Sequence, residues 1–368
     1  MESQVMTAQD RLYVVAQSGN IAAFNLFEDG SMKALPGSPF PTGAGTFSIV
    51  ASPNGKWIYV APGQGLGSKI SKHMKRSAHL ASYPVLDDGT IGPLAQKVPL
   101  SAGLTPVSMA ISADGGNIYL GVGVWRAGFL RGAVAHYRVD ETGQMKESGR
   151  PVSLGRRVDG AAQPILSVDG RHLYVASVIA KAIVRLDVRD DGSLTEPVER
   201  SKSSGLFPIT PALSSDGRTL YAANEHSKSV TAFRVSDGGG LQELASSPYA
   251  TGRVPHNPVV SADGRFIYYA NTLSHTITGY AIQPDGALIA LPGSPYTTPT
   301  GPAALCRSTD GAWLYLVSSP VFGRDKSVVV SSWRTTASGD LEPSGQEPVR
   351  TGLQFADGPS ALVLPVRS

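Results

Sequence analysis

The sequence predicts an all-β fold, a seven-bladed β-propeller with four strands in each blade. The first observation is an internal repeat, in which a short apolar strand ends in a Ser-x-Asp/Asn-Gly turn and the next strand carries a Tyr. The second is the spacing, which is 47 residues between the turns of the last four copies and 55 and 60 residues before them. The third is that no stretch has a sustained helical period. Such a repeat is typical of propellers, because one unit cannot bury its hydrophobic face alone.

Six copies of the repeat are complete. They read SPNGKWIYVAP (52–62), SADGGNIYLGV (112–122), SVDGRHLYVAS (167–177), SSDGRTLYAAN (214–224), SADGRFIYYAN (261–271) and STDGAWLYLVS (308–318). The seventh is divided between the two ends of the chain, where 358–366 matches the strand before the turn and 11–17 the strand after it. We therefore expect the N- and C-terminal strands to pair and close the ring, with residues 1–368 forming a single domain.

The copy that begins at Ser214 shows how one blade is built. An inner strand is predicted to end near Leu213, followed by strands at 219–223, 229–235 and 241–246. Each run is rich in Val, Ile, Tyr, Thr or Leu and is bounded by Gly, Asp, Asn or Ser. The Asp-Gly pair supplies the turn, because Gly accepts a positive φ and Asp bonds to its own backbone.

Composition and charge exclude several classes of partner. The net charge is only +3, from 32 basic and 29 acidic residues, so a nucleic-acid partner is not expected. The single cysteine, Cys306, lies in a predicted inner strand and is interpreted as a packed thiol. The N-terminal segment lacks an apolar signal region and no run of ~18 apolar residues follows, so we expect a cytoplasmic protein without a membrane partner.

Known catalytic motifs are missing from the sequence. It has no Gly-x-Ser-x-Gly elbow, His-Glu-x-x-His, phosphate-binding Gly-Lys-Ser/Thr loop or Cys-x-x-Cys, so no cofactor is expected. Oxygen donors on one face leave a divalent cation in the channel as an open alternative, but no ligand spacing calls for a metal. The oligomeric state is left open.

One face of the propeller is expected to carry the function. The loops between second and third strands, and those from each outer strand to the next inner strand, emerge there, and the Asp-Gly turns lie on the other face. The two longest blades lengthen on this face, at 63–79, which holds six basic side chains and no acid, and at 124–133. Insertions confined to one face mark a binding side, and a basic insertion favours an anionic ligand. The alternative is a solvated loop that Lys and Arg keep soluble.

Three segments, LPGSPF (35–40), LASSPY (244–249) and LPGSPY (291–296), are each followed by a Gly-containing link into the next inner strand. With them, nearly the whole chain resembles the lactonase-like seven-bladed propellers, which include bacterial 6-phosphogluconolactonase and fungal carboxymuconate cyclase. The resemblance implies a lactonase, or a related cyclase, isomerase or lyase, acting on a small anionic, carboxylated molecule. It is more specific for the fold than for the activity, because propellers carry unrelated functions.

Two segments suggest the catalytic residues. AANEHSKSVTAF (222–233) resembles the family's Asn-Glu segment, and GRVPHNP (252–258) resembles its Gly-Arg-Pro-Arg-His segment. The resemblance implies that Glu225 and His256 face each other near the channel, as base and acid for opening or closing a lactone. Arg253 and Arg157 are predicted to hold the anion. The other predicted substrate-binding residues on this face are Asn224, His226, Asn271, Trp125, Arg126, Phe207 and Phe355.

Two departures from the family pattern leave a second hypothesis open. Ala162 and Gln163 stand where the lactonising members carry a catalytic His, and Thr272 stands where an Arg often follows the Asn. These losses favour a non-catalytic scaffold that binds a ligand or a partner protein. The retained Glu225 and His256, together with the basic insertion, favour the enzyme.

The same residues also have a purely structural interpretation. Asn224 and Glu225 could satisfy backbone groups between blades, as buried polar groups often do. His256 could be a packed, neutral histidine.

Overall fold

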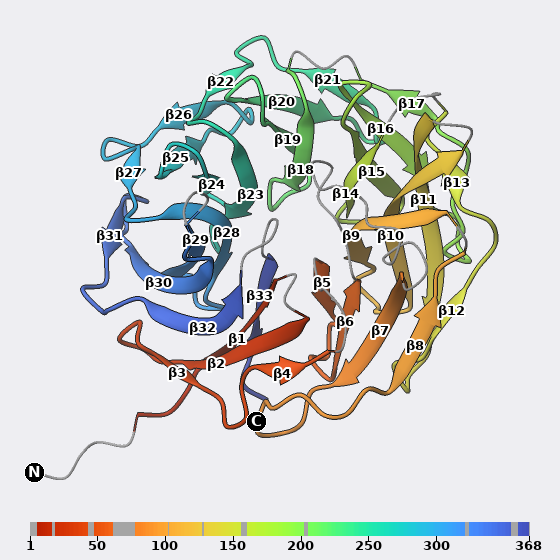
Figure 1. Cartoon of the computed structure of the whole chain (residues 1–368). Helices are drawn as coiled ribbons and strands as arrows, with labels where there is room; N and C mark the ends of the chain where they lie inside the picture. The colour runs from red at the N-terminus through yellow and green to blue at the C-terminus, as the bar shows by residue number, and fades with distance from the viewer. Residues whose placement is uncertain are drawn as a thin grey trace, which may run out of the picture.

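The computed structural model describes residues 6–16, 19–42, 48–61, 78–101, 103–126, 129–155, 160–201, 205–320, 324–354 and 360–367. Within these ranges the side chains of 125–126, 129–130 and 161–162 are not described. The chain folds into seven antiparallel sheets arranged in a ring (Figure 1), which confirms the predicted seven-bladed propeller. Among the described residues, no helix has the length and apolar character needed to cross a membrane.

Each blade has four strands in a row from the channel outward. Blade 1 contains β33 (Ser360–Pro365), β1 (Asp10–Ala16), β2 (Asn20–Leu26) and β3 (Met32–Ala34). Blade 2 contains β5 (Ser48–Ala51), β6 (Trp57–Ala61), β7 (His79–Pro84) and β8 (Gln96–Pro99). Blade 3 contains β9 (Leu104–Ile111), β10 (Asn117–Arg126), β11 (Phe129–Val139) and β12 (Met145–Glu147). Blade 4 contains β14 (Ala161–Leu166), β15 (His172–Ser177), β16 (Ala182–Asp187) and β17 (Glu199–Arg200).

The last three blades follow the same order. Blade 5 contains β18 (Pro208–Leu213), β19 (Thr219–Asn224), β20 (Ser229–Val235) and β21 (Leu241–Glu243). Blade 6 contains β23 (Pro255–Val260), β24 (Phe266–Asn271), β25 (Thr276–Ile282) and β26 (Leu288–Ala290). Blade 7 contains β28 (Gly301–Arg307), β29 (Trp313–Ser319), β30 (Ser327–Thr335) and β31 (Leu341–Pro343). Short strands beside the third strands of five blades are β4 (Phe40–Pro41), β13 (Val152–Ser153), β22 (Tyr249–Ala250), β27 (Tyr296–Thr297) and β32 (Val349–Gln354).

The ring closes as the divided repeat predicts. β33 pairs antiparallel with β1, in a register that runs from Asp10 opposite Pro365 to Val15 opposite Ser360. Figure 1 shows these two strands, dark blue and red, side by side in one blade. Blade 1 is therefore assembled from both ends of the described chain.

The outer strand of blade 5 is shorter than predicted. β21 ends at Glu243, whereas the apolar pattern suggests a strand over 241–246. The chain turns at this point, because Ser247 N–H bonds to the Leu244 carbonyl and Ser247 Oγ accepts a hydrogen bond from Ala232 N–H. The second and third strands, β19 and β20, match the prediction to within one residue.

The Tyr of the repeat links each blade to the next. In five blades its buried hydroxyl donates a hydrogen bond of 2.7–2.9 Å to the carbonyl of a turn glycine in the following blade. The donor and acceptor pairs are Tyr13 and Gly89, Tyr119 and Gly192, Tyr174 and Gly239, Tyr221 and Gly286, and Tyr268 and Gly339. We call these contacts the interblade tyrosine bonds. They explain why the Tyr recurs, since a buried hydroxyl needs a partner.

The residue two places before that Tyr packs against the turn glycine of the next blade. We call it the interblade residue. In blades 1 to 7 it is Arg11, Trp57, Asn117, His172, Thr219, Phe266 and Trp313, and the glycines that they meet are Gly89, Gly143, Gly192, Gly239, Gly286, Gly339 and Gly30. All seven glycines have a positive φ, and a Cβ on any of them would lie only 2.2–2.6 Å from the interblade residue. Glycine is required there by backbone conformation and by the close approach.

Candidate functional site

Glu225 and His256 form a direct contact across two blades. Glu225 is the first residue of the turn between β19 and β20 in blade 5, and His256 lies in β23, the inner strand of blade 6. His256 Nε2 lies 2.6 Å from Glu225 Oε1. The side chains are partly buried, with 14% of Glu225 and 23% of His256 exposed, so a small molecule can reach the pair. The juxtaposition expected from the sequence is present.

Backbone hydrogen bonds fix the turn that carries Glu225. Glu225 N–H donates to the Phe207 carbonyl at 3.1 Å, and Thr272 N–H donates in the same way to the Val254 carbonyl of blade 6. Phe207 and Val254 both have a positive φ, of 62° and 59°, which is unfavourable for residues with a Cβ. Such conformations persist where the surrounding structure imposes them, and they are concentrated at functional sites. The starts of β18 and β23 are therefore each held by the hairpin turn of their own blade.

Asn224 and Asn271, which the sequence predicts to bind substrate, lie inside the hairpins of blades 5 and 6. Both side chains are completely buried. The Asn224 amide donates to Thr231 Oγ1 at 2.8 Å, and the Asn271 amide donates to Thr278 Oγ1 at 2.7 Å. Neither side chain is exposed to solvent, and these hydrogen bonds join the two strands of each hairpin. The printed partners of Asn224 are side chains of its own blade, and not backbone groups of a neighbouring blade.

Phe207 and His226 lie together beside the Glu225 turn. Their rings stack with centroids 4.5 Å apart and planes 18° apart, and His226 is exposed. Because His226 directly follows Glu225 in sequence, the stacked rings form a flat surface next to the Glu225 and His256 pair. Such a surface suits an apolar or ring-shaped part of a ligand.

Arg253 lies three residues before His256 and is exposed. Its backbone N–H donates to Ser274 Oγ at 2.7 Å, which fixes the chain at this point. Among the residues that the structure describes, no carboxylate forms an ion pair with its guanidinium group. Arg253 is thus a cation beside the site that remains available to an anion.

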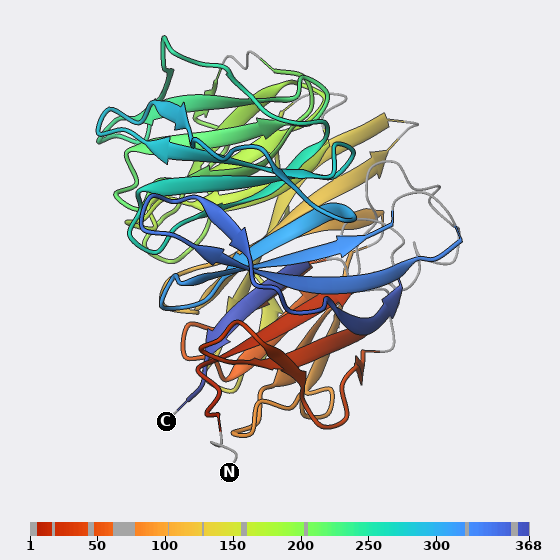
Figure 2. The same cartoon turned by 90° about the vertical axis from the view of Figure 1, so that its left-hand side faces the viewer.

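Four of the predicted substrate-binding residues are not described by the structure, or are described only in their backbone. Arg157 and Phe355 are outside the described residues, as is the basic insertion from 62 to 77. Trp125 and Arg126 end β10, and their side chains are not described. The backbone pairing of the β10–β11 hairpin continues to Arg126 opposite Phe129. Figure 2 shows this long hairpin, in yellow-orange, extending beyond its neighbours on one side of the ring.

A cavity of about 180 Å³ occupies the channel. All seven inner strands contribute to its wall. The polar lining residues are Ser48, Ser108, Gln163, Asn257 and Ser360, and the others are Ile49, Val50, Met109, Pro211, Pro258, Ala304, Leu305 and Ala361. None is charged, so the cavity offers neutral hydrogen-bonding groups on an apolar wall. Asn257, in the cavity wall, directly follows His256 in β23, whereas Glu225 and His256 do not themselves line the cavity.

No motif in the sequence marks the residues of this lining. Gln163 stands where the family pattern has a His, and the serines lie in inner strands without a distinctive motif. Their shared position becomes evident only when the seven inner strands are arranged in a ring. Within the described ranges, no group of three or more His, Cys, Asp or Glu side chains could hold a metal ion.

Comparisons with known proteins agree with the fold. A protein-family model described as lactonase, 7-bladed beta-propeller, matches residues 130–255, which confirms the family resemblance. A candidate 6-phosphogluconolactonase from Bacteroides fragilis superposes with a TM-score of 0.76 at 17% identity, covering 99% of this chain and 100% of that one. The periplasmic gluconolactonase of Pseudomonas aeruginosa gives 0.76 at 18% identity, covering 95% and 98%. A Lactobacillus plantarum protein gives 0.77 at 15% identity, covering 97% and 99%.

A search of curated proteins found no match. At identities below 20%, the structural likeness establishes the fold and not the activity.

Proposed function

We propose that this lactonase-family propeller is an enzyme that hydrolyses or forms a ring ester in a small anionic molecule, at the contact between Glu225 and His256. The observation that carries the proposal is the 2.6 Å contact between His256 Nε2 and Glu225 Oε1 at the channel mouth. When a carboxylate is hydrogen-bonded to one imidazole nitrogen, it orients the ring and leaves the other nitrogen to accept or donate a proton.

The contact assigns a role to each side chain. A neutral His256 donates its Nε2–H to the Glu225 carboxylate, which leaves the Nδ1 lone pair to accept a proton. Glu225 then orients the imidazole ring and stabilises the imidazolium that forms. This differs from the expectation that Glu225 is itself the base, because its nearer oxygen is engaged by His256.

Hydrolysis then needs one proton to move in each direction. His256 Nδ1 takes a proton from water, and the hydroxide adds to the lactone carbonyl carbon. When the tetrahedral intermediate collapses, the ring C–O bond breaks and the imidazolium returns its proton to the departing alkoxide. The products are a hydroxyl group and a carboxylic acid on one chain, and the acid releases its proton to solvent to become a carboxylate; the reverse sequence closes the ring.

The surroundings favour a hydroxylated substrate with one charged end. The neutral Ser, Gln and Asn side chains of the channel cavity can bind hydroxyl groups. The exposed guanidinium group of Arg253 can bind a carboxylate at the mouth. Arg157 is proposed to assist it, as the sequence predicted.

The test is turnover of sugar and aromatic-acid lactones, and of their open hydroxy acids in reverse, followed by pH-stat and mass spectrometry. Wild type is compared with Glu225→Gln, His256→Ala and the control His275→Asn. His275 is exposed in the turn of blade 6 that corresponds to the Glu225 turn, and its φ of 55° is one that Asn tolerates. We expect turnover to be lost in the first two variants and retained in the control, with all four proteins folded.

Turnover that survives in both Glu225→Gln and His256→Ala would rule out this pair as the catalytic groups. If no lactone is converted in either direction, the second hypothesis of a binding scaffold replaces the enzyme.

A further inference from the structure

The interface between blades 5 and 6 has an unusually small interblade residue. Trp57, Phe266 and Trp313 fill this position in blades 2, 6 and 7, and Arg11 and His172 fill it in blades 1 and 4. In blade 3, the shorter Asn117 is supported by His136, whose Nε2 lies 2.8 Å from Asn117 Oδ1. Blade 5 has only Thr219.

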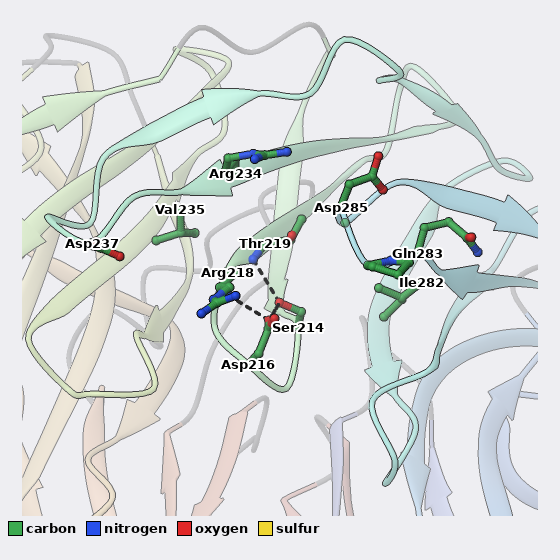
Figure 3. A pocket seen from close by; sticks show the side chains of 12 residues that line it. Ser214, Asp216, Arg218, Thr219, Arg234, Val235, Asp237, Ile282, Gln283 and Asp285 are labelled. Carbon is green, nitrogen blue, oxygen red and sulfur yellow. Dashed lines mark hydrogen bonds between the residues drawn. The ribbon is translucent and has the colours of Figure 1, made fainter.

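A cavity of about 220 Å³ lies where the larger side chains would stand (Figure 3). It opens on the face that carries the Asp-Gly turns, and we call it the blade 5–6 groove. Its lining residues are Ser214, Asp216, Arg218, Thr219, Arg234, Val235, Asp237, Ile282, Gln283, Pro284, Asp285 and Gly286. This volume accommodates several groups the size of a water molecule, which is enough for a small organic anion.

Two guanidinium groups line the groove, and the positive charge of Arg218 contributes to lowering the pKa of the neighbouring Asp216. Arg218 and Arg234 are both exposed, and no described carboxylate lies within ion-pair distance of either side chain. Arg234 sits directly opposite Thr219 in the pairing of β19 with β20, so it faces the next blade as Thr219 does. Figure 3 shows the Arg234 side chain extended above Thr219.

The nearby carboxylates are largely engaged in closing turns. Asp216 Oδ1 accepts hydrogen bonds from Ser214 Oγ at 2.6 Å and from Arg218 N–H at 3.0 Å. Asp285 Oδ1 accepts from Ala287 N–H at 3.0 Å. Asp237 lies on an exposed turn at the rim. These hydrogen bonds occupy Asp216 Oδ1 and Asp285 Oδ1, and the two guanidinium groups are the cations that line the groove.

We propose that the blade 5–6 groove binds a small anion carrying a carboxylate or phosphate group, held by Arg218 and Arg234. Guanidinium groups match the geometry of both anions and bind them with paired hydrogen bonds. Gln283 and Ser214 offer further polar contacts in the wall.

This groove is separate from the Glu225 and His256 pair. Thr219 begins β19, and Glu225 follows the end of the same strand, so the two sites lie at opposite faces of the propeller. A strand of this length places them about 20 Å apart. The groove therefore shares no residue with the proposed catalytic pair.

The test is isothermal titration calorimetry with inorganic phosphate and with succinate as separate probes. Thr219→Trp fills the groove with the side chain that blades 2 and 7 use. Arg234→Gln removes one guanidinium group, and Arg334→Gln is the matched control, because Arg334 is exposed and pairs with Trp313 as Arg234 pairs with Thr219. All titrations are repeated on an Arg253→Gln background, which weakens any anion binding at the channel mouth.

We expect at least one probe to bind wild type, at least tenfold weaker binding in Arg234→Gln and Thr219→Trp, and less than a twofold change in Arg334→Gln. Binding of only phosphate or only succinate identifies the anion class. Equal losses in Arg234→Gln and Arg334→Gln, or no binding of either probe at millimolar concentration, would overturn the proposal. The arginine pair decides the matter even if Thr219→Trp does not fold.

Discussion

Replacing Gly286 by Ala tests whether the close approach between blades matters beyond backbone conformation. Gly286 has a φ of +87°, and a Cβ there would lie 2.2 Å from Thr219 Oγ1. Gly170 is the matched control, because its φ is +72° and a Cβ there meets nothing within 4 Å. Both glycines donate their N–H to a carbonyl three residues earlier, at 2.8 Å and 2.9 Å. The two sites differ mainly in the neighbouring blade.

The magnitudes follow from these two geometries. A left-handed conformation costs a non-glycine residue about 1–2 kcal/mol, and this is the full effect that we expect for Gly170→Ala. Gly286→Ala must also displace Thr219, and forcing extra atoms into a packed site costs about 1–3 kcal/mol. The movement strains the bond from the Tyr221 hydroxyl to the Gly286 carbonyl as well. We expect a total loss of about 2–5 kcal/mol.

The assay is the free energy of unfolding from urea titration, followed by circular dichroism. The double variant Thr219→Ala with Gly286→Ala should recover part of the loss, because the atom that clashes is removed. If Gly286→Ala and Gly170→Ala agree within about 0.5 kcal/mol, the close approach between blades contributes nothing measurable and the reasoning is wrong.

Three further predictions concern buried groups. Tyr268→Phe should lower the free energy of unfolding by about 1–2 kcal/mol in urea titration, because the Gly339 carbonyl loses its hydrogen-bond donor. The control Tyr137→Phe should change it little, because the buried Tyr137 hydroxyl has no described partner. Equal effects would contradict the role of the interblade tyrosine bonds. Burial raises the pKa of the Tyr119 hydroxyl from 10.0 to about 12, so as the pH rises the unfolded chain loses this proton before the folded protein does. The stability of the folded protein should therefore fall between pH 10 and 12. Thermal unfolding measured across that range should show a less steep fall in Tyr119→Phe. Burial also raises the pKa of the Cys306 thiol to about 12, so iodoacetamide at pH 8 should label it in denaturant and not in the native protein, as mass spectrometry would show.

The repeat predicted the blades well because its signals are local. An Asp-Gly turn between two apolar runs marks a hairpin wherever it occurs, and the divided copy at 11–17 and 358–366 predicted the pairing of β33 with β1. The contact between Glu225 and His256 was expected from the family's segments and not from periodicity. The repeat spacing alone does not predict that a side chain in the turn of one blade contacts a side chain in the inner strand of the next blade.

Other features depend on tertiary packing that the sequence does not display. Asn224 follows a strand on the functional face and looks available for a ligand, yet Thr231 binds its amide inside the hairpin. The interblade residues differ so much in type that no common role is visible before the blades are stacked. The small size of Thr219 carries meaning only beside Trp57 and Trp313.

The five interblade tyrosine bonds all point the same way around the ring, from a blade to the one that follows it. Within a single chain this is the head-to-tail association of a cyclic oligomer, which ends only because the rotation from one unit to the next completes a circle. A fragment of two or three blades would expose a donor edge at one side and a matching acceptor edge at the other. We expect such fragments to associate into open chains of copies, since the complete circle alone leaves neither edge free.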